Sequence, residues 1–223
     1  ITEGIRSLLT PDGVFVFEVS YLLDVIEKSL FDTIYHEHLC YHSVKPLQAF
    51  FRLHGMELIN VERVSPKLGS LRGTVQLKGG PRGTSPSVAR LIDLETTRGL
   101  HRAETLRAFA AHIERVKAQI GELLSKLRTQ GMTVAGYGAS STVTTLVYHF
   151  GLGDALSFIA DDNPLKQGMF TPGKHIPVLP SEAIYERNSD HVIILAWNYA
   201  QTIMAKHKAF VERGGHFVVP LPT

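Results

Sequence analysis

The sequence predicts an α/β protein, and two features of its pattern support that class. Short runs of branched apolar residues alternate with amphipathic segments from Met132 to the end of the chain. Such alternation of strand and helix is typical of a parallel sheet with right-handed crossovers. Ahead of it, one long apolar stripe at helical spacing ends near Gln130. At 223 residues, the chain has room for one large domain or two small ones.

The first 80 residues mix helices and strands. Pro11-Asp12-Gly13 is typical of a turn. Pro46 suits the first turn of a helix, and Gly55 marks the end of the same helix. Helices are therefore expected at residues 1–9, 21–31 and 45–55, and strands at 14–19, 56–64 and 71–77. The link between the last two strands is short, so we expect them to pair antiparallel. A helix followed by a strand is the second half of an α/β unit, and with Ile rather than Met at position 1 we expect the chain to begin inside a larger domain.

Residues 78–87 are rich in Gly, Pro and Ser, which is typical of a domain linker. A long helix should follow, beginning near Ser87 or near Arg102 and ending at Gly131. Its apolar stripe is Leu106, Phe109, Ile113, Val116, Ile120, Leu123, Leu124 and Leu127. Beyond it we expect strands within residues 132–140, 157–164, 191–198 and 216–222, and helices within 141–152 and 199–215.

Composition excludes several classes of function. The net charge is +2, and no basic run or interleaving of basic and aromatic residues points to nucleic acid. Cys40 is the single cysteine, so a disulfide framework and a multi-cysteine zinc site are excluded. No apolar run approaches the roughly 18 residues of a membrane span, and no signal peptide stands at the start. We expect a cytoplasmic protein with no membrane partner.

The segment "FDTIYHEHLCYHS", residues 31–43, concentrates titratable side chains. His36 and His38 would point one way in an extended chain and Glu37 the other. Two histidines without a clear third ligand make a poor metal site, so no metal is assigned. A solvated surface loop is the plainer alternative. The third is acid–base chemistry, because a histidine titrates near pH 6.5 and a neighbouring carboxylate or phenol can orient it.

The carboxyl ends of the expected parallel strands carry the other candidate residues. In such sheets ligands bind at those ends. The turn Gly136-Tyr137-Gly138-Ala139-Ser140 allows a close backbone approach to a phosphate, and Asp161 and Asp162 follow at the end of the next strand. Ser141 replaces the third glycine of a dinucleotide fingerprint. Both a nucleotide-type ligand and a tight turn without a ligand remain open from the spacing alone.

Six segments occur in an order and spacing that carry a resemblance: "FDTIYHEHLCYHS", "GSLRG", "GYGAS", "DDNPLKQGMFTPGKHIPV", "ILAWNYA" and "GGHFVVPLP". Together the chain resembles, from Ile1 to Pro222, the S-adenosylmethionine-dependent C-methyltransferases that methylate a carbon of dTDP-linked keto-deoxysugars. "YHEH" and "DDNPLKQG" with the later "TPG" are specific, whereas "GYGAS" alone is not.

The resemblance implies a three-part architecture: a small zinc-binding domain, a class I methyltransferase domain and a Rossmann-like domain. Residues 1–80 would be the end of the methyltransferase sheet. Residues 88–223 would be the Rossmann-like, nucleotide-sugar-binding domain with its long leading helix. Zinc would belong only to the missing first domain. The glycine-rich loop that grips S-adenosylmethionine would also precede this chain, so the chain alone should bind the methyl donor poorly.

The resemblance also assigns roles to single residues. His38 corresponds to the family's base, which removes the proton next to the ketone, and Glu37 and Tyr35 would assist it. His36 and Arg72 are expected to have substrate-binding or structural roles. The nucleotide sugar would contact the turn Gly136, Tyr137, Gly138, Ala139 and Ser140, then Asn163, Lys166 and Gln167, and then Trp197, Asn198 and Tyr199. Core packing for Trp197 and a solvated surface position for Lys166 are the plainer alternatives.

Two departures from the family pattern stand out. Lys67 and Leu68 replace the usual His-Gly before "GSLR", and Ser141-Thr142-Val143 replace a common Ala-Lys-Gly. They point to a different sugar or to a changed activity. Two other functions remain open: an NAD(P)-dependent oxidoreductase of nucleotide sugars, which the glycine turn and the late acids suggest, and a non-catalytic nucleotide-binding module.

Overall fold

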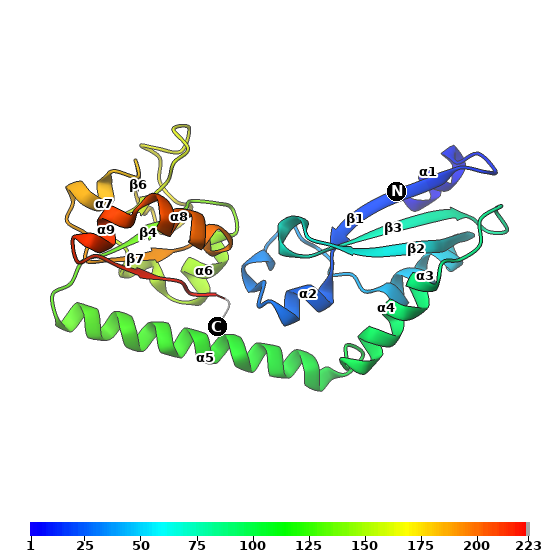
Figure 1. The fold of residues 1–223 in the computed structure, drawn as a ribbon, viewed down its shortest axis with the longest axis horizontal. Coiled ribbons are helices and arrows are strands. Elements are labelled where there is room, and N and C mark those ends of the chain that lie inside the picture. Colours follow the sequence, from blue (N-terminus) through cyan, green and yellow to red (C-terminus); the bar gives the residue numbers. More distant parts are fainter. Residues whose placement is uncertain (222–223) are drawn as a thin grey trace. The chain divides into compact units, whose positions relative to one another are not determined.

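The computed structural model describes residues 1–221, and it divides into two compact units (Figure 1). Unit 1 contains Ile1–Leu30 and His38–Ala110. Unit 2 contains Phe31–Glu37 and the chain from Ala111 onward. The α/β class is confirmed, because an antiparallel sheet and a parallel sheet are each combined with helices.

Unit 1 is built on a three-stranded sheet in the order β1-β3-β2 (Figure 1). Its strands are β1 (Val14–Ser20), β2 (Met56–Val64) and β3 (Ser70–Leu77). The expected antiparallel pairing of β2 with β3 is confirmed, and β1 also pairs antiparallel with β3. Alternate side chains of β2 and β3, including Met56, Leu58 and Val75, enter a core that α3 and α4 help to cover.

The helices of unit 1 are α1 (Thr2–Leu8), α2 (Leu22–Glu27), α3 (Val44–Leu53) and α4 (Pro86–Thr97). α2 is shorter than expected, because Ser29 has a left-handed backbone with φ 54°. α3 ends as predicted, at Gly55 with φ 69°. Its first two free N–H groups, those of Val44 and Lys45, donate to the buried Glu95 carboxylate of α4.

The segment expected to link two domains, residues 78–87, is held within unit 1. Gln76 accepts a hydrogen bond from the Arg82 N–H and donates one to its carbonyl, at 3.1 and 2.8 Å. Ser87 Oγ then accepts from the N–H of Val61 in β2, and Val88 enters the core. The compact units therefore divide at Ala110, not at the Gly- and Pro-rich segment, because α4 packs on the first sheet.

The expected long helix is broken in two. Gly99, with φ 68°, ends α4, and α5 (Ala103–Thr129) begins at the later of the two predicted starts. Ile113, Val116, Ile120 and Leu127 of the predicted stripe are buried, whereas Leu106 is exposed. No helix among residues 1–221 is long and apolar enough to cross a bilayer.

Unit 2 contains a five-stranded parallel sheet in the order β6-β5-β4-β7-β8. Its strands are β4 (Val134–Tyr137), β5 (Ile159–Ala160), β6 (Val178–Leu179), β7 (His191–Ile194) and β8 (His216–Val218). The predicted parallel arrangement is confirmed. The two-residue strand β6 was not predicted, because it is too short to show a pattern. Pro222, the end of the last predicted strand, lies outside the described residues.

The helices of unit 2, besides most of α5, are α6 (Val143–His149), α7 (Ala183–Glu186), α8 (Ala200–Lys206) and α9 (Lys208–Glu212). The single helix expected at 199–215 is interrupted at His207, whose backbone is not helical. α7 was not predicted. A turn of 3-10 helix, η4 (Trp197–Tyr199), leads from the end of β7 into α8.

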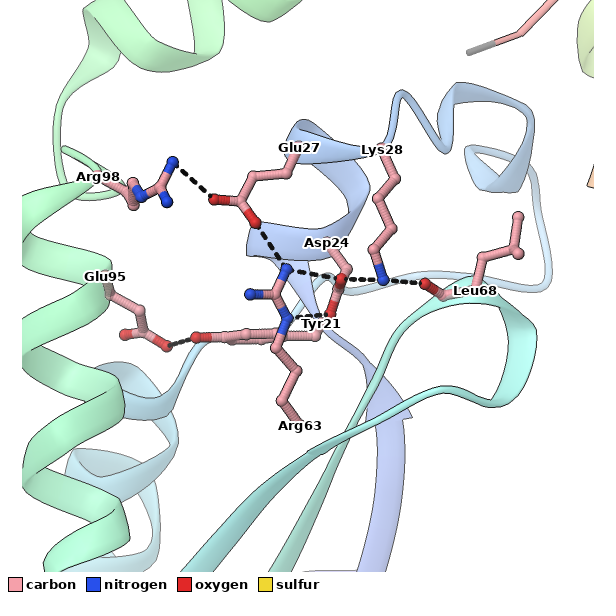
Figure 2. Close-up of polar contacts among 8 residues, drawn as sticks. All are labelled: Tyr21, Asp24, Glu27, Lys28, Arg63, Leu68, Glu95 and Arg98. Atoms are coloured by element: carbon pink, nitrogen blue, oxygen red, sulfur yellow. Dashed lines mark hydrogen bonds and ion pairs between the residues drawn. The ribbon is translucent and has the colours of Figure 1, made fainter.

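A charged network surrounds Asp24, which is completely buried in α2 (Figure 2). Arg63 donates to both carboxylate oxygens, at 3.0 and 2.8 Å, and Lys28 pairs with Oδ1 at 2.5 Å. Arg63 also pairs with Glu27, which pairs with Arg98 of the segment after α4. Because Asp24 has three charge-assisted contacts in a buried position, it fixes α2 to the end of β2.

Replacing Asp24 with Asn should lower the free energy of unfolding by about 3 kcal/mol, the lower end for a buried pair, because Arg63 and Lys28 are partly exposed. Urea unfolding measures the change. The matched control is Glu104→Gln, which breaks an exposed pair with Arg107 and should cost less than about 0.5 kcal/mol. Equal effects of the two substitutions would refute the structural role of Asp24.

The two unusual residues before "GSLR" adopt a left-handed backbone. Lys67 has φ 51° and Leu68 has φ 67°, and the Leu68 carbonyl accepts a hydrogen bond from Lys28. The next residue, Gly69, packs directly against the Asp24 side chain of the charged network. A Cβ at this position would lie 2.3 Å from Cγ of Asp24. A side chain at Leu68 therefore imposes strain that glycine would avoid.

Leu68→Gly should be more stable than Leu68→Ala by about 1 kcal/mol, because both remove the same packing and only glycine relieves the strain. Thermal unfolding of the two variants measures the difference. A Leu68→Ala protein at least as stable as Leu68→Gly would show that the positive φ is not a constraint.

Candidate functional site

The carboxyl ends of β5, β4 and β7 lie side by side in unit 2, because these strands are neighbours in the parallel sheet. The Gly138 N–H donates to the Ala160 carbonyl at 2.7 Å, and the N–H of Leu195 donates to the Tyr137 carbonyl at 2.9 Å. The sheet therefore brings together the three loops that the sequence predicted to carry a ligand site: residues 136–140, 163–167 and 197–199.

Close packing within the protein explains why both positions of the turn, 136 and 138, are glycine. Gly138 has φ 96°, and a Cβ there would lie 2.4 Å from Cβ of Ala196. A Cβ at Gly136 would lie 2.7 Å from Cδ1 of Leu195. Both glycines let the turn pack on the end of β7, and this does not depend on a ligand.

Asp161 joins the glycine turn to the loop after β5. The side chain is buried, and its Oδ2 accepts hydrogen bonds from Ala139 N at 2.6 Å and from Lys166 Nζ at 3.1 Å. Its Oδ1 accepts from Asn163 N at 2.8 Å, and its carbonyl accepts from Gln167 Nε2 at 3.0 Å. Three predicted site residues thus bind the Asp161 carboxylate, and a fourth, Gln167, binds its main-chain carbonyl. Asp161, one of the two acids that follow this strand, is therefore engaged within the protein.

The neighbouring Asp162 ends a chain of hydrogen bonds through unit 2. Tyr137 donates its hydroxyl to Asp162 at 2.8 Å and lies 2.9 Å from Nε2 of the buried His207. Tyr185 lies 2.9 Å from Nδ1 of His207. Since the single hydroxyl hydrogen of Tyr137 goes to Asp162, Nε2 carries the proton in neutral His207 and Nδ1 accepts from Tyr185. This chain fixes Tyr137 and the start of the loop that carries Lys166.

A cavity of about 130 Å³ adjoins the glycine turn. Ala139, Ser140 and Lys166 are among its lining residues, so three predicted binding residues line it. The rest of its wall comes from α6 and from residues 169–172, which are mainly apolar. A site with few polar groups and an apolar wall is typical of a small-molecule site.

The histidine-rich segment is divided between the units, and its first part packs against α6 in unit 2. Thr145 Oγ1 donates to the Ile34 carbonyl at 3.1 Å, and the Phe31 ring stacks on Phe150 with centroids 5.7 Å apart. Ser141 Oγ donates to the Tyr35 hydroxyl at 3.4 Å. Tyr35 is thereby brought to the residue that follows the glycine turn.

Tyr35 and Glu37 form a direct pair, because the Tyr35 hydroxyl donates to Glu37 Oε2 at 2.8 Å. The Ser141 hydroxyl lowers the pKa of Tyr35, but the bond to Glu37 and partial burial together raise it above its usual value. The exposed His36 ring stands edge-on to the Tyr35 ring, with centroids 5.5 Å apart. A carboxylate and a phenol of this segment are therefore in direct contact.

Asp32 is a buried acid that the sequence analysis did not single out. It lies in the 3-10 helix η1 (Phe31–Thr33), and its carboxyl is buried. Burial raises the pKa of the Asp32 carboxyl, although the nearby Trp197 and Thr142 side chains lower it in part. Trp197 is itself buried, so it offers a ligand little surface, whereas Asn198 and Tyr199 of η4 are exposed. A lone aspartate among apolar residues gave no pattern to detect.

The remaining predicted residues belong to unit 1. His38 is half-buried, and its ring stands edge-on to the Tyr41 ring, with centroids 6.4 Å apart. Arg72 of β3 pairs with Glu18 of β1 at 2.9 Å across the sheet. Within residues 1–221, no three His, Cys, Asp or Glu side chains are grouped so that they could hold a metal ion.

Comparison with known proteins decides the family. Residues 67–222 match the family model described as the C-methyltransferase C-terminal domain. The chain belongs to the C-methyltransferase family. Its 223 residues are also 38% identical to the C-methyltransferase NovU of Streptomyces niveus, over the whole of this chain and 53% of that relative. The chain therefore spans about half the length of the curated relative that it matches.

Methyltransferases generally use S-adenosylmethionine. In unit 2, Asp161 accepts a hydrogen bond from the Ala139 N–H of the glycine turn, and the sheet of unit 1 is antiparallel.

The buried His207 makes the stability of unit 2 depend on pH. Burial, then the neighbouring Lys206, lowers its pKa, although Asp162 and Glu182 oppose this. The unfolded chain therefore binds a proton at this residue near pH 6.5, where the folded protein does not, and stability should fall as the pH drops below about 6.5.

His207→Gln should flatten this dependence between about pH 6.5 and 5, measured by thermal unfolding. The control His175→Gln, at an exposed position, should keep it. An unchanged pH profile in His207→Gln would contradict the assignment.

Proposed function

We propose that this chain is the substrate-binding and proton-abstracting part of an enzyme that methylates a carbon of a dTDP-linked 4-keto-deoxysugar. The observation that carries the proposal is the packing of Tyr35–Glu37 beside the glycine turn and its cavity, within one unit. Membership of the C-methyltransferase family supports the reaction class. The sugar and its nucleotide belong to the proposal.

Lys166 and Ser140 provide the polar groups for the diphosphate. Lys166 is partly exposed and shares Asp161 with the Ala139 N–H, so the ammonium group is already held beside the turn. A preorganised cation of this kind contributes to phosphate binding without a large entropic cost. α6 has only seven residues, so we assign the main phosphate contact to the lysine rather than to the helix dipole.

His38 acts as the base in this proposal. Its imidazole accepts the proton from the carbon next to the ketone, and the electron pair moves onto the ketone oxygen to give an enolate. Glu37, oriented by the Tyr35 hydroxyl, accepts a hydrogen bond from the sugar. S-adenosylmethionine, which the complete protein would bind through other residues, supplies the electrophilic methyl group. A positioned base is worth about 10²- to 10⁴-fold in rate.

The NAD(P)-dependent alternative has less support. It requires a free acid after the second strand to bind the ribose hydroxyls. Asp161 is instead occupied by Ala139 and Lys166, and Asp162 by Tyr137 and Lys206 at 2.5 Å. Nucleotide binding without catalysis does not explain the hydrogen-bonded Tyr35–Glu37 pair beside the glycine turn.

The proposal is tested by proton exchange in a protein that carries this chain together with a methyl-donor-binding domain. The 4-keto sugar nucleotide is incubated in D₂O without the donor, and deuterium at the carbon next to the ketone is followed by NMR. His38→Ala should slow exchange about 10²- to 10⁴-fold. The control His101→Ala, at an exposed position on the segment after α4, should exchange at the parental rate. Exchange at the parental rate in His38→Ala would remove His38 as the base.

A further inference from the structure

The strand order of unit 2 defines a crevice at the carboxyl ends of β4 and β7. β4 is the first strand of the parallel sheet, β5 and β6 follow on one side of it, and β7 and β8 then lie on the other. Ligands of open α/β sheets bind where the strand order reverses in this way. The loop after β4 and the turn η4 after β7 therefore flank the place where such a sheet usually holds its ligand.

A segment of the chain itself packs at this crevice. Residues 31–37, which we call the η1 segment, belong to unit 2 although they are distant from its sheet in sequence. Thr145 of α6 donates a hydrogen bond to the Ile34 carbonyl at 3.1 Å. Ser141, just ahead of α6, donates to the Tyr35 hydroxyl at 3.4 Å. These bonds attach the η1 segment to the side of the crevice that follows β4.

Asp32 extends the attachment to the side that follows β7. Thr142 stands at the start of α6, and Trp197 begins η4. Burial raises the pKa of the Asp32 carboxyl, and the Trp197 and Thr142 side chains are near enough to lower it in part. One carboxyl of the η1 segment therefore lies close to residues from both loops that flank the crevice.

An acceptor and a donor are left unpaired at this point. Asp32 Oδ1 and Trp197 Nε1 are both shielded from solvent, and neither has a hydrogen-bond partner within residues 1–221. The two residues are only 8% and 6% exposed. An indole N–H can only donate and an ionised carboxylate can only accept, so each group supplies what the other lacks. A direct bond between them would remove two unfavourable buried groups at once.

We propose that Asp32 is a positioning residue: its carboxylate accepts a hydrogen bond from the Trp197 indole and thereby holds the η1 segment in the ligand crevice of the sheet. The segment is then a built-in occupant of that crevice, and its docking sets where Tyr35 and Glu37 lie beside the glycine turn. The docking itself does not depend on the proposed function. Its effect on catalysis does, because Asp32 acts there through Tyr35 and Glu37.

The indole N–H gives a direct test of the hydrogen bond. Trp197 is the single tryptophan, so the ¹⁵N-labelled 223-residue chain has one indole signal in its nuclear magnetic resonance spectrum. Asp32→Ala should shift this signal and speed the exchange of the indole hydrogen with D₂O roughly tenfold. Asp32→Asn keeps an acceptor oxygen and should stay within about threefold of the parent rate. The matched control is Asp154→Ala, an exposed aspartate in another 3-10 helix, η3 (Leu152–Asp154), and its indole signal should be unchanged.

Two backbone amides report whether the η1 segment stays docked. The N–H groups of Ile34 and Tyr35 donate within the segment, at 3.0 and 3.1 Å, and short turns of this kind exchange by local opening. Asp32→Ala should speed their exchange roughly tenfold, and Asp32→Asn should restore most of the protection. Ile193→Val, which shortens a buried side chain of β7, lowers overall stability and should leave both rates unchanged.

The effect on catalysis is measured in a protein that carries this chain together with a methyl-donor-binding domain. Deuterium exchange next to the ketone of the 4-keto sugar nucleotide is followed at a saturating concentration, so that substrate affinity does not enter the rate. Asp32→Ala should slow this exchange roughly tenfold, because misplaced groups beside the reacting carbon lose their orientation. Asp32→Asn should recover most of the rate.

The outcomes separate this inference from the proposed function. An indole signal and amide exchange in Asp32→Ala that match the parent chain would overturn the positioning role. Equal acceleration of the two amides in Ile193→Val would overturn it as well, because the amides would then follow overall stability. Loss of docking without slower sugar exchange would refute the effect on catalysis. A parent protein that exchanges no sugar hydrogen would refute the proposed function alone, since docking is measured without substrate.

Discussion

The buried carboxylate of Asp161 holds the candidate site together. A tight turn after β4 and a loop after β5 would otherwise be two separate segments at a sheet edge. Asp161 accepts hydrogen bonds from the backbone of both, at Ala139 and Asn163, and from the side chain of Lys166. Charge-assisted hydrogen bonds of this kind are roughly twice as strong as neutral ones. The same carboxylate therefore shapes the turn, positions the cation and removes the acid that a dinucleotide site would need.

The division of the histidine-rich segment has a functional consequence. Tyr35 and Glu37 pack with the proposed substrate-binding unit, whereas His38 belongs to the unit built on the antiparallel sheet. The proposed base and its assisting residues are thus adjacent in sequence but belong to different packing units.

Much of the fold was predictable from sequence because its signals are local. The apolar runs gave β4 and β7, and the spacing of Ile113, Val116 and Ile120 gave α5. The break at Gly99 and the short strand β6 depend on tertiary packing, so no local pattern showed them. The Gly- and Pro-rich residues near Arg82 are anchored to Gln76 within unit 1, a contact that composition does not report. Within the site, the loops were foreseen from the strand ends, but the roles of Asp32, Asp161 and His207 depend on burial and were not.

The most direct test of the account is a nuclear magnetic resonance titration of the isotopically labelled chain with dTDP. The account predicts that the largest changes in amide chemical shift fall on Ala139, Ser140, Lys166 and Phe170, with smaller changes at Tyr35 and Glu37, which pack against the turn through Ser141. Changes confined to unit 1, or to the opposite end of the parallel sheet, would contradict the claim that this turn and its cavity form the substrate site.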